Sequence, residues 1–396
     1  MGSTSRRVVV KVKNSYEVLS MCIGLSVVVA LVGAPGDVRA DEDRLPGELS
    51  FADHEDECPR YLQLLSGKLF RERDNHAETS ADEGKTWQRG GQINPFKLGW
   101  KLKDVAIQLQ SEEYQGRIVV PFYLGMYGKH PDFDVKERGG YVTWKGKVFR
   151  LQTHTHHPEM SGSFVCYSDD DGKTWQCSVN DSGRGFMMGY LKDGHMGHLT
   201  CEEPVVAELK DGRLLCFMRS TCGRILKSTS EDGGAHWMKV RATDIAMANS
   251  PCTLKRLPTT GDLVLVWNMM SAGEIRQGYR RGRLSIALSQ DDGQTWENVK
   301  TLELSPGLEN NNWVQPPPLQ PMIRGPSGRE NLMGEIPDGF THYNYSTVYL
   351  SKDKIFIRYA VTPPDGVGSK ESWRVFPISW LYLKSIAENL DGRRAP

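Results

Sequence analysis

The chain has 396 residues, of which 49 are Lys or Arg and 49 are Asp or Glu, so its formal net charge is zero. Without a net positive field it lacks the electrostatic basis for general binding to nucleic acid or to an anionic membrane surface. Charged residues make up 25% and hydrophobic residues 39% of the chain, with 40 Gly and 21 Pro, which is typical of a turn-rich globular protein and argues against disorder.

The first forty residues have the composition of an export signal. Four basic residues precede an apolar run over residues 21–34, and small residues follow up to Ala40. The stretch SRRVVVK, residues 5–11, also resembles a twin-arginine signal. We predict a signal peptide over residues 1–40 and an exported (periplasmic or secreted) mature protein. The alternative is an uncleaved membrane anchor, although an apolar run of about 14 residues is short for a bilayer.

The number of cysteines that follow the predicted signal peptide is odd. Eight are present, and Cys22 lies in the predicted signal. Because seven remain, at least one must stay unpaired in an exported protein, and no spacing typical of a zinc site occurs. The sequence assigns no disulfide among Cys58, Cys166, Cys177, Cys201, Cys216, Cys222 and Cys252.

One eight-residue pattern, S-x-D-x-G-x-x-W, occurs four times. Ser and Asp side chains bond nearby backbone amides, Gly adopts an angle that other residues resist, and Trp folds back as an apolar plug. The pattern therefore predicts a rigid β-hairpin turn, an Asp box, with a structural role. The copies are SADEGKTW (80–87), SDDDGKTW (168–175), SEDGGAHW (230–237) and SQDDGQTW (289–296).

The spacing of the boxes predicts the architecture. Successive copies are 88, 62 and 59 residues apart, and the 356 residues after Ala40 correspond to six repeats of about 59. Strand-rich repeats of this length indicate radially arranged four-stranded sheets. We therefore predict an all-β fold, a six-bladed β-propeller with Asp-box turns, in one domain over residues 41–396. The longest gap indicates an insertion around residues 126–140.

Four stretches outside the boxes carry the candidate functional residues. In residues 57–87, Arg60 precedes an apolar strand and Asp74 follows in a loop. Arg71 and Arg73 are the alternatives to Arg60 as the functional arginine of this stretch. In residues 202–220, a glutamate begins one strand and Arg219 ends the next. Arg219 follows apolar residues, and a buried guanidinium needs an anionic partner.

The other two stretches lie nearer the C-terminus. Residues 279–296 place Arg281 eight residues before the Ser of the fourth box, with Arg280 and Arg283 as alternatives. Residues 341–360 contain Tyr345 directly before Ser346 and the strand TVYL. The competing tyrosines are Tyr343 and Tyr349.

These stretches, in this order, resemble the sialidase (exo-α-neuraminidase) family of six-bladed propellers with Asp boxes. The resemblance covers most of residues 50–385 and is strongest over residues 200–300. It implies a retaining glycoside hydrolase that removes terminal sialic acids and needs no metal or other cofactor. It also implies that residues 373–383 form a last strand that completes a blade begun at the N-terminus. The chain departs from the family pattern in that only 14 residues separate Arg60 from Asp74 and residues 76–84 lack the usual strand between Asp74 and the first box.

The resemblance also assigns roles to residues. Tyr345 matches the nucleophile, Glu203 the base that activates it, with Glu202 as the alternative, and Asp74 the acid/base. A neutral phenol suits this reaction because the carboxylate on the anomeric carbon of sialic acid repels an anionic attacker. Guanidinium groups would hold that carboxylate by charge-assisted hydrogen bonds. The arginines that match are Arg60, Arg219 and Arg281.

Other readings remain open at this point. His154, His156 and His157 could form a metal site, but a role in contacting substrate is favoured, and we predict no metal. The predicted partners are sialylated glycoproteins, glycolipids and oligosaccharides, with no nucleic acid and no stable membrane insertion of the mature chain. Alternative functions are a non-catalytic propeller that binds glycans or proteins, and a glycosidase for another acidic sugar.

Overall fold

The chain divides into two units, Met1–Arg44 and Leu45–Pro396, and all the secondary structure below belongs to the second. Residues 1–43 lie outside the described part, so the signal peptide stays a prediction. The structure is a computed structural model and describes residues 44–95, 99, 101–128, 141–144, 147–152, 160–179, 185–188, 201–311, 313–316, 318, 336–363 and 367–384.

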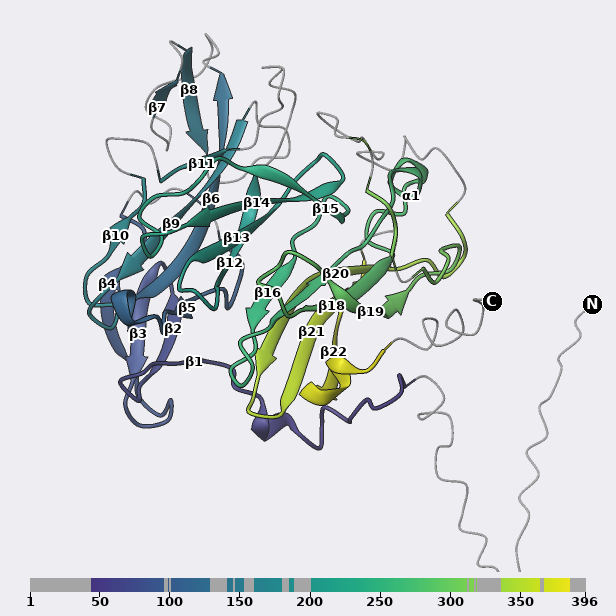
Figure 1. The fold of residues 1–396 in the computed structure, drawn as a ribbon, viewed down its shortest axis with the longest axis horizontal. Coiled ribbons are helices and arrows are strands. Elements are labelled where there is room, and N and C mark those ends of the chain that lie inside the picture. The colour runs from purple at the N-terminus through teal and green to yellow at the C-terminus, as the bar shows by residue number, and fades with distance from the viewer. Residues whose placement is uncertain are drawn as a thin grey trace, which may run out of the picture. The chain divides into compact units, whose positions relative to one another are not determined.

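Five antiparallel sheets follow one another along the chain (Figure 1). The first has four strands: β1 (Leu62–Gln63), β2 (Leu69–Arg73), β3 (His76–Ser80) and β4 (Gln88–Gln92). The second has seven: β5 (Ile107–Gln108), β6 (Ile118–Gly128), β7 (Tyr141–Trp144), β8 (Lys147–Gln152), β9 (Met160–Ser168), β10 (Gln176–Cys177) and β11 (Met187–Met188).

The remaining sheets contain the strands that carry most candidate residues. The third is β12 (Glu202–Glu208), β13 (Leu214–Arg219), β14 (Arg224–Ser230) and β15 (Arg241–Ala246). The fourth is β16 (Thr253–Arg256), β17 (Leu263–Trp267), β18 (Arg283–Ser289) and β19 (Glu297–Leu304). The fifth is β20 (His342–Leu350), β21 (Lys354–Thr362) and β22 (Lys370–Pro377).

The fifth sheet is extended by the N-terminal part of this unit. Leu49 forms an antiparallel bridge with Val375 of β22, and the Leu49 amide donates to the Val375 carbonyl at 2.8 Å. Phe51 stacks on Trp373, with ring centroids 4.1 Å apart. The segment around Leu49 therefore joins the blade that β22 completes, as expected, but the expected strand over residues 373–383 ends at Pro377 and residues 378–382 form a 3-10 helix.

Helices are few and short among the described residues. The α-helix α1 (Ala272–Gln277) begins with a capping box, in which Ser271 and Glu274 satisfy each other's backbone amides. No helix within the described ranges combines the length and apolar character needed to cross a bilayer. The 3-10 helices are η2 (Glu55–Glu57), η3 (Glu112–Tyr114) and η5 (Ile378–Tyr382).

The four Asp boxes connect β3 to β4, β9 to β10, β14 to β15 and β18 to β19. A strand, β3, is therefore present between Asp74 and the first box, where the sequence indicated none. In the second copy, Gly172 N donates to Ser168 Oγ at 2.9 Å, and Thr174 N donates to Asp170 Oδ1 at 2.8 Å. Gly172 has φ of 83°, which favours glycine, and Trp175 Nε1 donates to the Gly172 carbonyl at 3.0 Å. The other boxes repeat the Ser and Asp bonds. The predicted turn is therefore confirmed.

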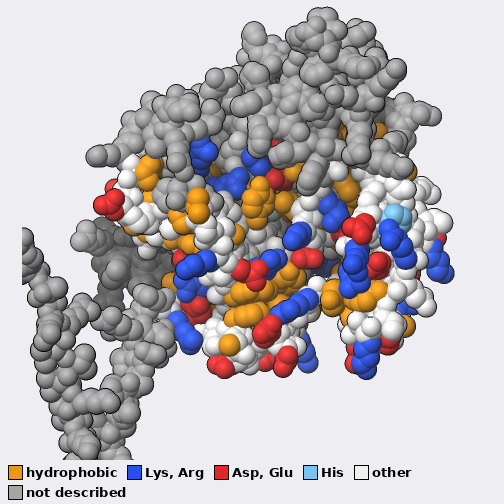
Figure 2. Space-filling model, turned by 180° about the vertical axis from the view of Figure 1, so that it is seen from behind, with side chains coloured by type: hydrophobic (Ala, Val, Ile, Leu, Met, Phe, Trp, Pro, Cys, Tyr) orange, Lys and Arg blue, Asp and Glu red, His pale blue; other side chains and the backbone are white. Residues whose placement is uncertain are grey.

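Apolar side chains fill the spaces between successive sheets. Strands β12, β17 and β18 are buried along their whole length, and β17 (LVLVW) is apolar throughout, whereas β12 and β18 also bury polar side chains. Hydrophobic clusters join the first sheet to the second, the second to the third, the third to the fourth and the fourth to the fifth. Figure 2 shows positive and negative side chains mixed over one face, as the zero net charge leads one to expect.

The predicted all-β propeller with Asp-box turns is confirmed, with five sheets among the described residues where the repeat length predicted six blades. The 88 residues between the first two boxes account for part of the difference. They contribute mainly to one seven-stranded sheet, in which β6 continues to Gly128 and a β7–β8 hairpin extends it. Residues 129–140 of the predicted insertion lie outside the described part.

One disulfide is present in the described part. Cys166 and Cys177 join β9 to β10 across the second Asp box. The other five cysteines after residue 44 are buried thiols: Cys58, Cys201, Cys216, Cys222 and Cys252. The sequence could not assign this pair, because the partners become neighbours only through the strand register.

Candidate active site

A buried ion pair forms the base of the site. Glu203 lies at the start of β12, only 2% exposed, and Arg219 lies at the end of β13. Arg219 Nη1 donates to Glu203 Oε2 at 2.8 Å. The strand register shifts between Glu202 and Val205, and Glu203 takes a φ of 47°, which is uncommon for a residue other than glycine. Such strain in a bulge is typical of functional sites.

Two asparagines connect this pair to Arg281. Arg219 Nε donates to Asn249 Oδ1 at 2.6 Å, and Arg281 Nη2 donates to the Asn249 carbonyl at 3.1 Å. Arg281 Nη1 donates to Asn344 Oδ1 at 2.9 Å. Asn249 therefore holds the two guanidinium groups near each other. Since the one carboxylate, Glu203, pairs with Arg219, and Arg281 has neutral partners, positive charge remains available for an anionic ligand.

Tyr345 lies beside these arginines. It sits in a second bulge, where the register of β20 shifts between Asn344 and Thr347, and its φ is 52°. The Arg281 guanidinium carbon lies 5.2 Å from the centre of the Tyr345 ring. The Tyr345 side chain is 51% exposed, which is unusual for a large aromatic residue in a strand but is needed if its hydroxyl is to meet a ligand.

The competing residues are occupied elsewhere. Tyr343 is buried against Tyr359, and the Tyr349 hydroxyl donates to Asp104 Oδ2 at 2.7 Å. Arg283 is fully buried and pairs with Glu274 at 2.9 Å. Arg280 is exposed, without any of the contacts that hold Arg281. Geometry therefore separates candidates that sequence alone left open.

The structure does not bring Arg60 into this group. Its guanidinium pairs with Glu55 of η2, and both side chains are about half exposed. Its sequence rival Arg71 instead donates to Glu78 at 2.8 Å and lies over the Trp87 ring at 3.9 Å. The third arginine of the predicted set therefore lacks an evident equivalent among the described residues.

Asp74 lies at the tip of the β2–β3 hairpin. Arg73 pairs with His76, so Asp74 and Asn75 form a two-residue turn, with φ of 48° and 58°. The Asp74 side chain is exposed, and within the described ranges no hydrogen bond or ion pair of its carboxylate is recorded. Its acid/base role stays a prediction, because a tight turn has taken the place of the loop that the family pattern implies.

Burial and nearby charges shift the pKa values of Glu202, Arg219 and Arg281. Burial above all raises the pKa of Glu202 to about 7, with Glu203 acting in the same direction and Arg219 opposing. Burial works against the charge of Arg219, but the Glu203 carboxylate outweighs it and raises the pKa of Arg219. Burial, followed by the charge of Arg219, lowers the pKa of Arg281. An anionic ligand would relieve the repulsion between the two arginines.

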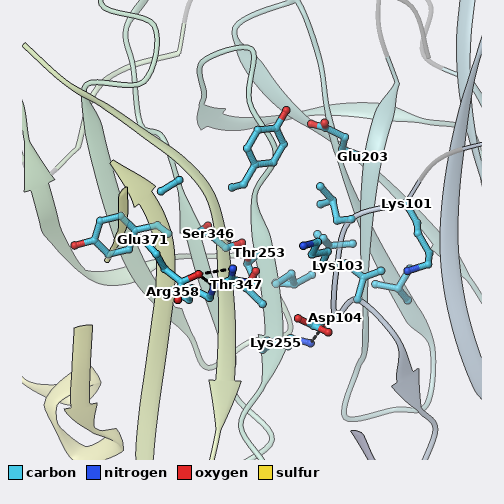
Figure 3. A pocket seen from close by; sticks show the side chains of 18 of the residues that line it. Lys101, Lys103, Asp104, Glu203, Thr253, Lys255, Ser346, Thr347, Arg358 and Glu371 are labelled. Atoms are coloured by element: carbon cyan, nitrogen blue, oxygen red, sulfur yellow. Dashed lines mark hydrogen bonds and ion pairs between the residues drawn. The ribbon is translucent and has the colours of Figure 1, made fainter. Parts of the chain in front are cut away.

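A pocket of about 560 Å³ adjoins the site. Glu203 and Tyr345 line it, and so does Tyr123 of β6. Figure 3 shows Glu203 at one end of the pocket and the pair Asp104–Lys255 at the other. A volume of this size suits a sugar ring or a small oligosaccharide.

Three residues at the site had no sequence signal. Asn249 and Asn344 lie in short polar stretches, where an asparagine is more often a turn residue. Tyr123 is only 5% exposed, and burial, followed by the charges of Glu203 and Glu202, raises its pKa above the usual range. Across the described residues, no cluster of His, Cys, Asp and Glu could hold a metal ion, and the three histidines of residues 154–157 lie outside that part.

These features define an all-β propeller with Asp-box turns and a Glu–Arg–Tyr cluster contributed by the start of β12, the end of β13, the residues before β18 and the bulge in β20. The profile of the BNR repeat-like domain matches residues 66–357, which is more than half of the chain. The chain therefore belongs to the BNR repeat-like family, and its resemblance to sialidase-type BNR propellers is confirmed at the level of family and fold.

Similar solved structures include sialidases and trans-sialidases. The intramolecular trans-sialidase of Ruminococcus gnavus, bound to oseltamivir carboxylate, is 16% identical over 78% of this chain and 51% of its own, with a TM-score of 0.42. A leech intramolecular trans-sialidase complexed with 2,7-anhydro-Neu5Ac is 17% identical over 77% and 36%, with the same score of 0.42. The Trypanosoma rangeli sialidase with 2,3-difluorosialic acid is 13% identical over 84% and 59%, with a score of 0.35. This chain spans about half, or less, of the first two.

Proposed function

We propose that this chain is an exported exo-sialidase that hydrolyses terminal sialic acids from glycoconjugates with retention of anomeric configuration. One observation carries the proposal: Glu203 bonds Arg219, Asn249 links Arg219 to Arg281, and Arg281 lies over the Tyr345 ring, although up to 142 residues separate these side chains. The solved structures that share this fold class include a sialidase, whose activity is the one proposed here.

Substrate binding would begin with the two arginines. Arg219 and Arg281 share Asn249 as a partner, so their guanidinium groups can bind one carboxylate with charge-assisted hydrogen bonds. Burial of Arg281 would strengthen this contact, because charges interact more strongly where water is excluded. The sugar ring would then lie over Tyr345.

Tyr345 would act as the nucleophile. Its hydroxyl proton would pass to Glu203 while the phenol oxygen attacks the anomeric carbon, and a covalent glycosyl–tyrosine would form as the aglycone leaves. Water would then attack the same carbon and release the sugar with its original configuration. A neutral phenol avoids the repulsion that the substrate carboxylate would exert on an Asp or Glu nucleophile.

Asp74 would protonate the leaving oxygen and later activate the water. From its exposed hairpin tip, the Asp74 carboxylate would have to reach the glycosidic oxygen of the bound substrate. Arg60 would be the third carboxylate-binding arginine only if it exchanges Glu55 for the substrate.

The positions of Arg60 and Asp74 favour one alternative, a non-catalytic propeller that binds acidic glycans. Such a protein would keep Arg219 and Arg281 but would not need an acid/base residue. A glycosidase for another acidic sugar would use the same residues on a different ring.

Release of 4-methylumbelliferone from its α-sialoside by the purified chain tests the proposal. We expect turnover by the parent and a loss of at least 100-fold in kcat for Tyr345→Phe and Glu203→Gln. Tyr343→Phe is the matched control, because Tyr343 precedes Tyr345 by two residues and its ring is buried against Tyr359. Absence of turnover with retained sialoside binding would favour the binding protein instead.

A further inference from the structure

The pocket beside Tyr345 continues away from the two arginines. Among the residues that the structure describes, neither Arg219 nor Arg281 lines it. Its far part is instead formed by the segment before β5 and by the outer face of the fifth sheet. Figure 3 shows Lys101 and Lys103 on one wall and Arg358 and Glu371 on the other.

The basic side chains of this pocket exceed its acidic ones. Five basic residues and three acidic residues line it: Lys101, Lys103, Lys255, Arg358 and Lys370, with Asp104, Glu203 and Glu371. Two of the cations have carboxylate partners, since Lys101 pairs with Glu72 and Arg358 Nε donates to Glu371 at 2.6 Å.

Lys103 and Lys370 are not neutralised in this way. Both side chains are exposed at the pocket, and within the described ranges no ion pair of either is recorded. They come from opposite walls, Lys103 from the segment before β5 and Lys370 from the first position of β22. Lys370 pairs with Val361 of β21 and Glu371 with Ala360, so the Lys370 side chain leaves β22 on the face opposite to Glu371. A ligand would therefore meet Lys103 on its wall and the Lys370 ammonium group at the rim of the pocket.

Lys255 provides a third cation at the far end. Its Nζ donates to the Asp104 carbonyl at 3.1 Å, whereas the Asp104 carboxylate accepts from the Tyr349 hydroxyl. An ammonium group has three donors, so two remain for a ligand in the pocket. Burial lowers the pKa of Lys255, and Asp104 and Glu72 counteract this only in part. An anion nearby would stabilise its charged form.

We propose that this pocket binds the carboxylate of a second acidic sugar, through Lys103, Lys370 and Lys255. The inference rests on the proposed function, because it takes the first acidic sugar to lie at Arg219, Arg281 and Tyr345. The second sugar is either the next unit of the same oligosaccharide or a separate acidic monosaccharide. The preferred substrates are then glycans with more than one acidic residue.

The test measures affinity and turnover separately. Calorimetry with the intact Tyr345→Phe chain gives the dissociation constants of an α2,8-linked sialic acid dimer, of 3′-sialyllactose and of free sialic acid. The same titrations are made in a Lys103→Ala/Lys370→Ala background and in a Lys255→Met background. The matched control is Lys85→Ala/Lys173→Ala, which removes two exposed charges from Asp-box turns. Turnover of 3′-sialyllactose by the parent tests the proposed function.

If the second sugar belongs to the same chain, the dimer binds about tenfold more tightly than 3′-sialyllactose, and 0.5 M NaCl weakens this preference. The exposed double variant then lowers the ratio to near one, and the control keeps it. If the second sugar is separate, two molecules of free sialic acid bind per chain, and the same lysines are needed for the second.

The inference is overturned if no ligand shows a lysine-dependent difference, or if the control pair changes the ratio as much. Lys255→Met alone does not decide the matter, since a half-buried lysine can support the fold. Turnover without a lysine-dependent preference rejects the second site and keeps the hydrolase. Lysine-dependent binding without turnover keeps the second site and rejects the hydrolase.

Discussion

Glu202 lies directly before Glu203 and is buried beside Arg219. Since burial raises the pKa of Glu202 to about 7 from a usual value of 4.5, the folded chain holds this proton more tightly than the unfolded chain. The free energy of unfolding should therefore fall as the pH rises from about 4.5 to about 7. In urea titrations, Glu202→Gln is expected to become more stable relative to the parent by roughly 1–3 kcal/mol between pH 5 and pH 8. Exposed Glu231→Gln should leave the slope unchanged, and equal slopes in all three proteins would reject this assignment.

At the residue scale, the sequence predicted the positions of side chains that lie near strand ends, whereas their roles stay predictions. Arg219 and Arg281 are found near Tyr345, and Glu203 meets Arg219, because each lies at a strand start or end that the pattern predicts. No strand end fixes the position of Asp74, because the residues around it can also form a two-residue turn. The sequence did not indicate Asn249 as a site residue, because its role depends only on bridging the guanidinium groups of Arg219 and Arg281.

The Asp box is the element whose structure follows most directly from its sequence. Asp170 accepts bonds from Ser168, from the Thr174 amide and from the Thr174 hydroxyl, all within 2.8 Å. Asp170→Ala removes these acceptors and is expected to lower the free energy of unfolding by about 1–3 kcal/mol without changing ligand affinity. Asp169→Ala, which removes a carboxylate paired with Arg117 at the surface, should cost less than about 1 kcal/mol. A loss of affinity in Asp170→Ala would show that the box is not purely structural.

At the scale of the whole molecule, closure depends on the segment around Phe51. This ring stacks on Trp373 and meets the edge of Phe356 at 6.4 Å. Phe51→Ala should lower the free energy of unfolding by about 2–3 kcal/mol and speed hydrogen exchange in β22, because its contacts hold Leu49 against the sheet. Leu65→Ala, an exposed apolar residue, is the control. Unchanged exchange in β22 would contradict this account.

The number of sheets shows the limit of repeat arithmetic. An average repeat assumes equal blades, whereas strands β5–β11 form one sheet of seven. Box turns are local and can be read from eight letters, but the way that long strands such as β6 recruit extra neighbours depends on pairing across many residues. The fold class was thus predictable from the sequence, while the described residues form five sheets where the repeat length predicted six blades.

The central claim is that the phenol of Tyr345 attacks an acidic sugar held by Arg219 and Arg281. Mass spectrometry of the chain after incubation with 2,3-difluorosialic acid tests it most directly, because this class of inhibitor traps a glycosyl–enzyme. We predict one adduct per chain, on the peptide containing Tyr345, and none in Tyr345→Phe. An adduct on another residue, or sialoside hydrolysis that continues without any adduct, would contradict the account.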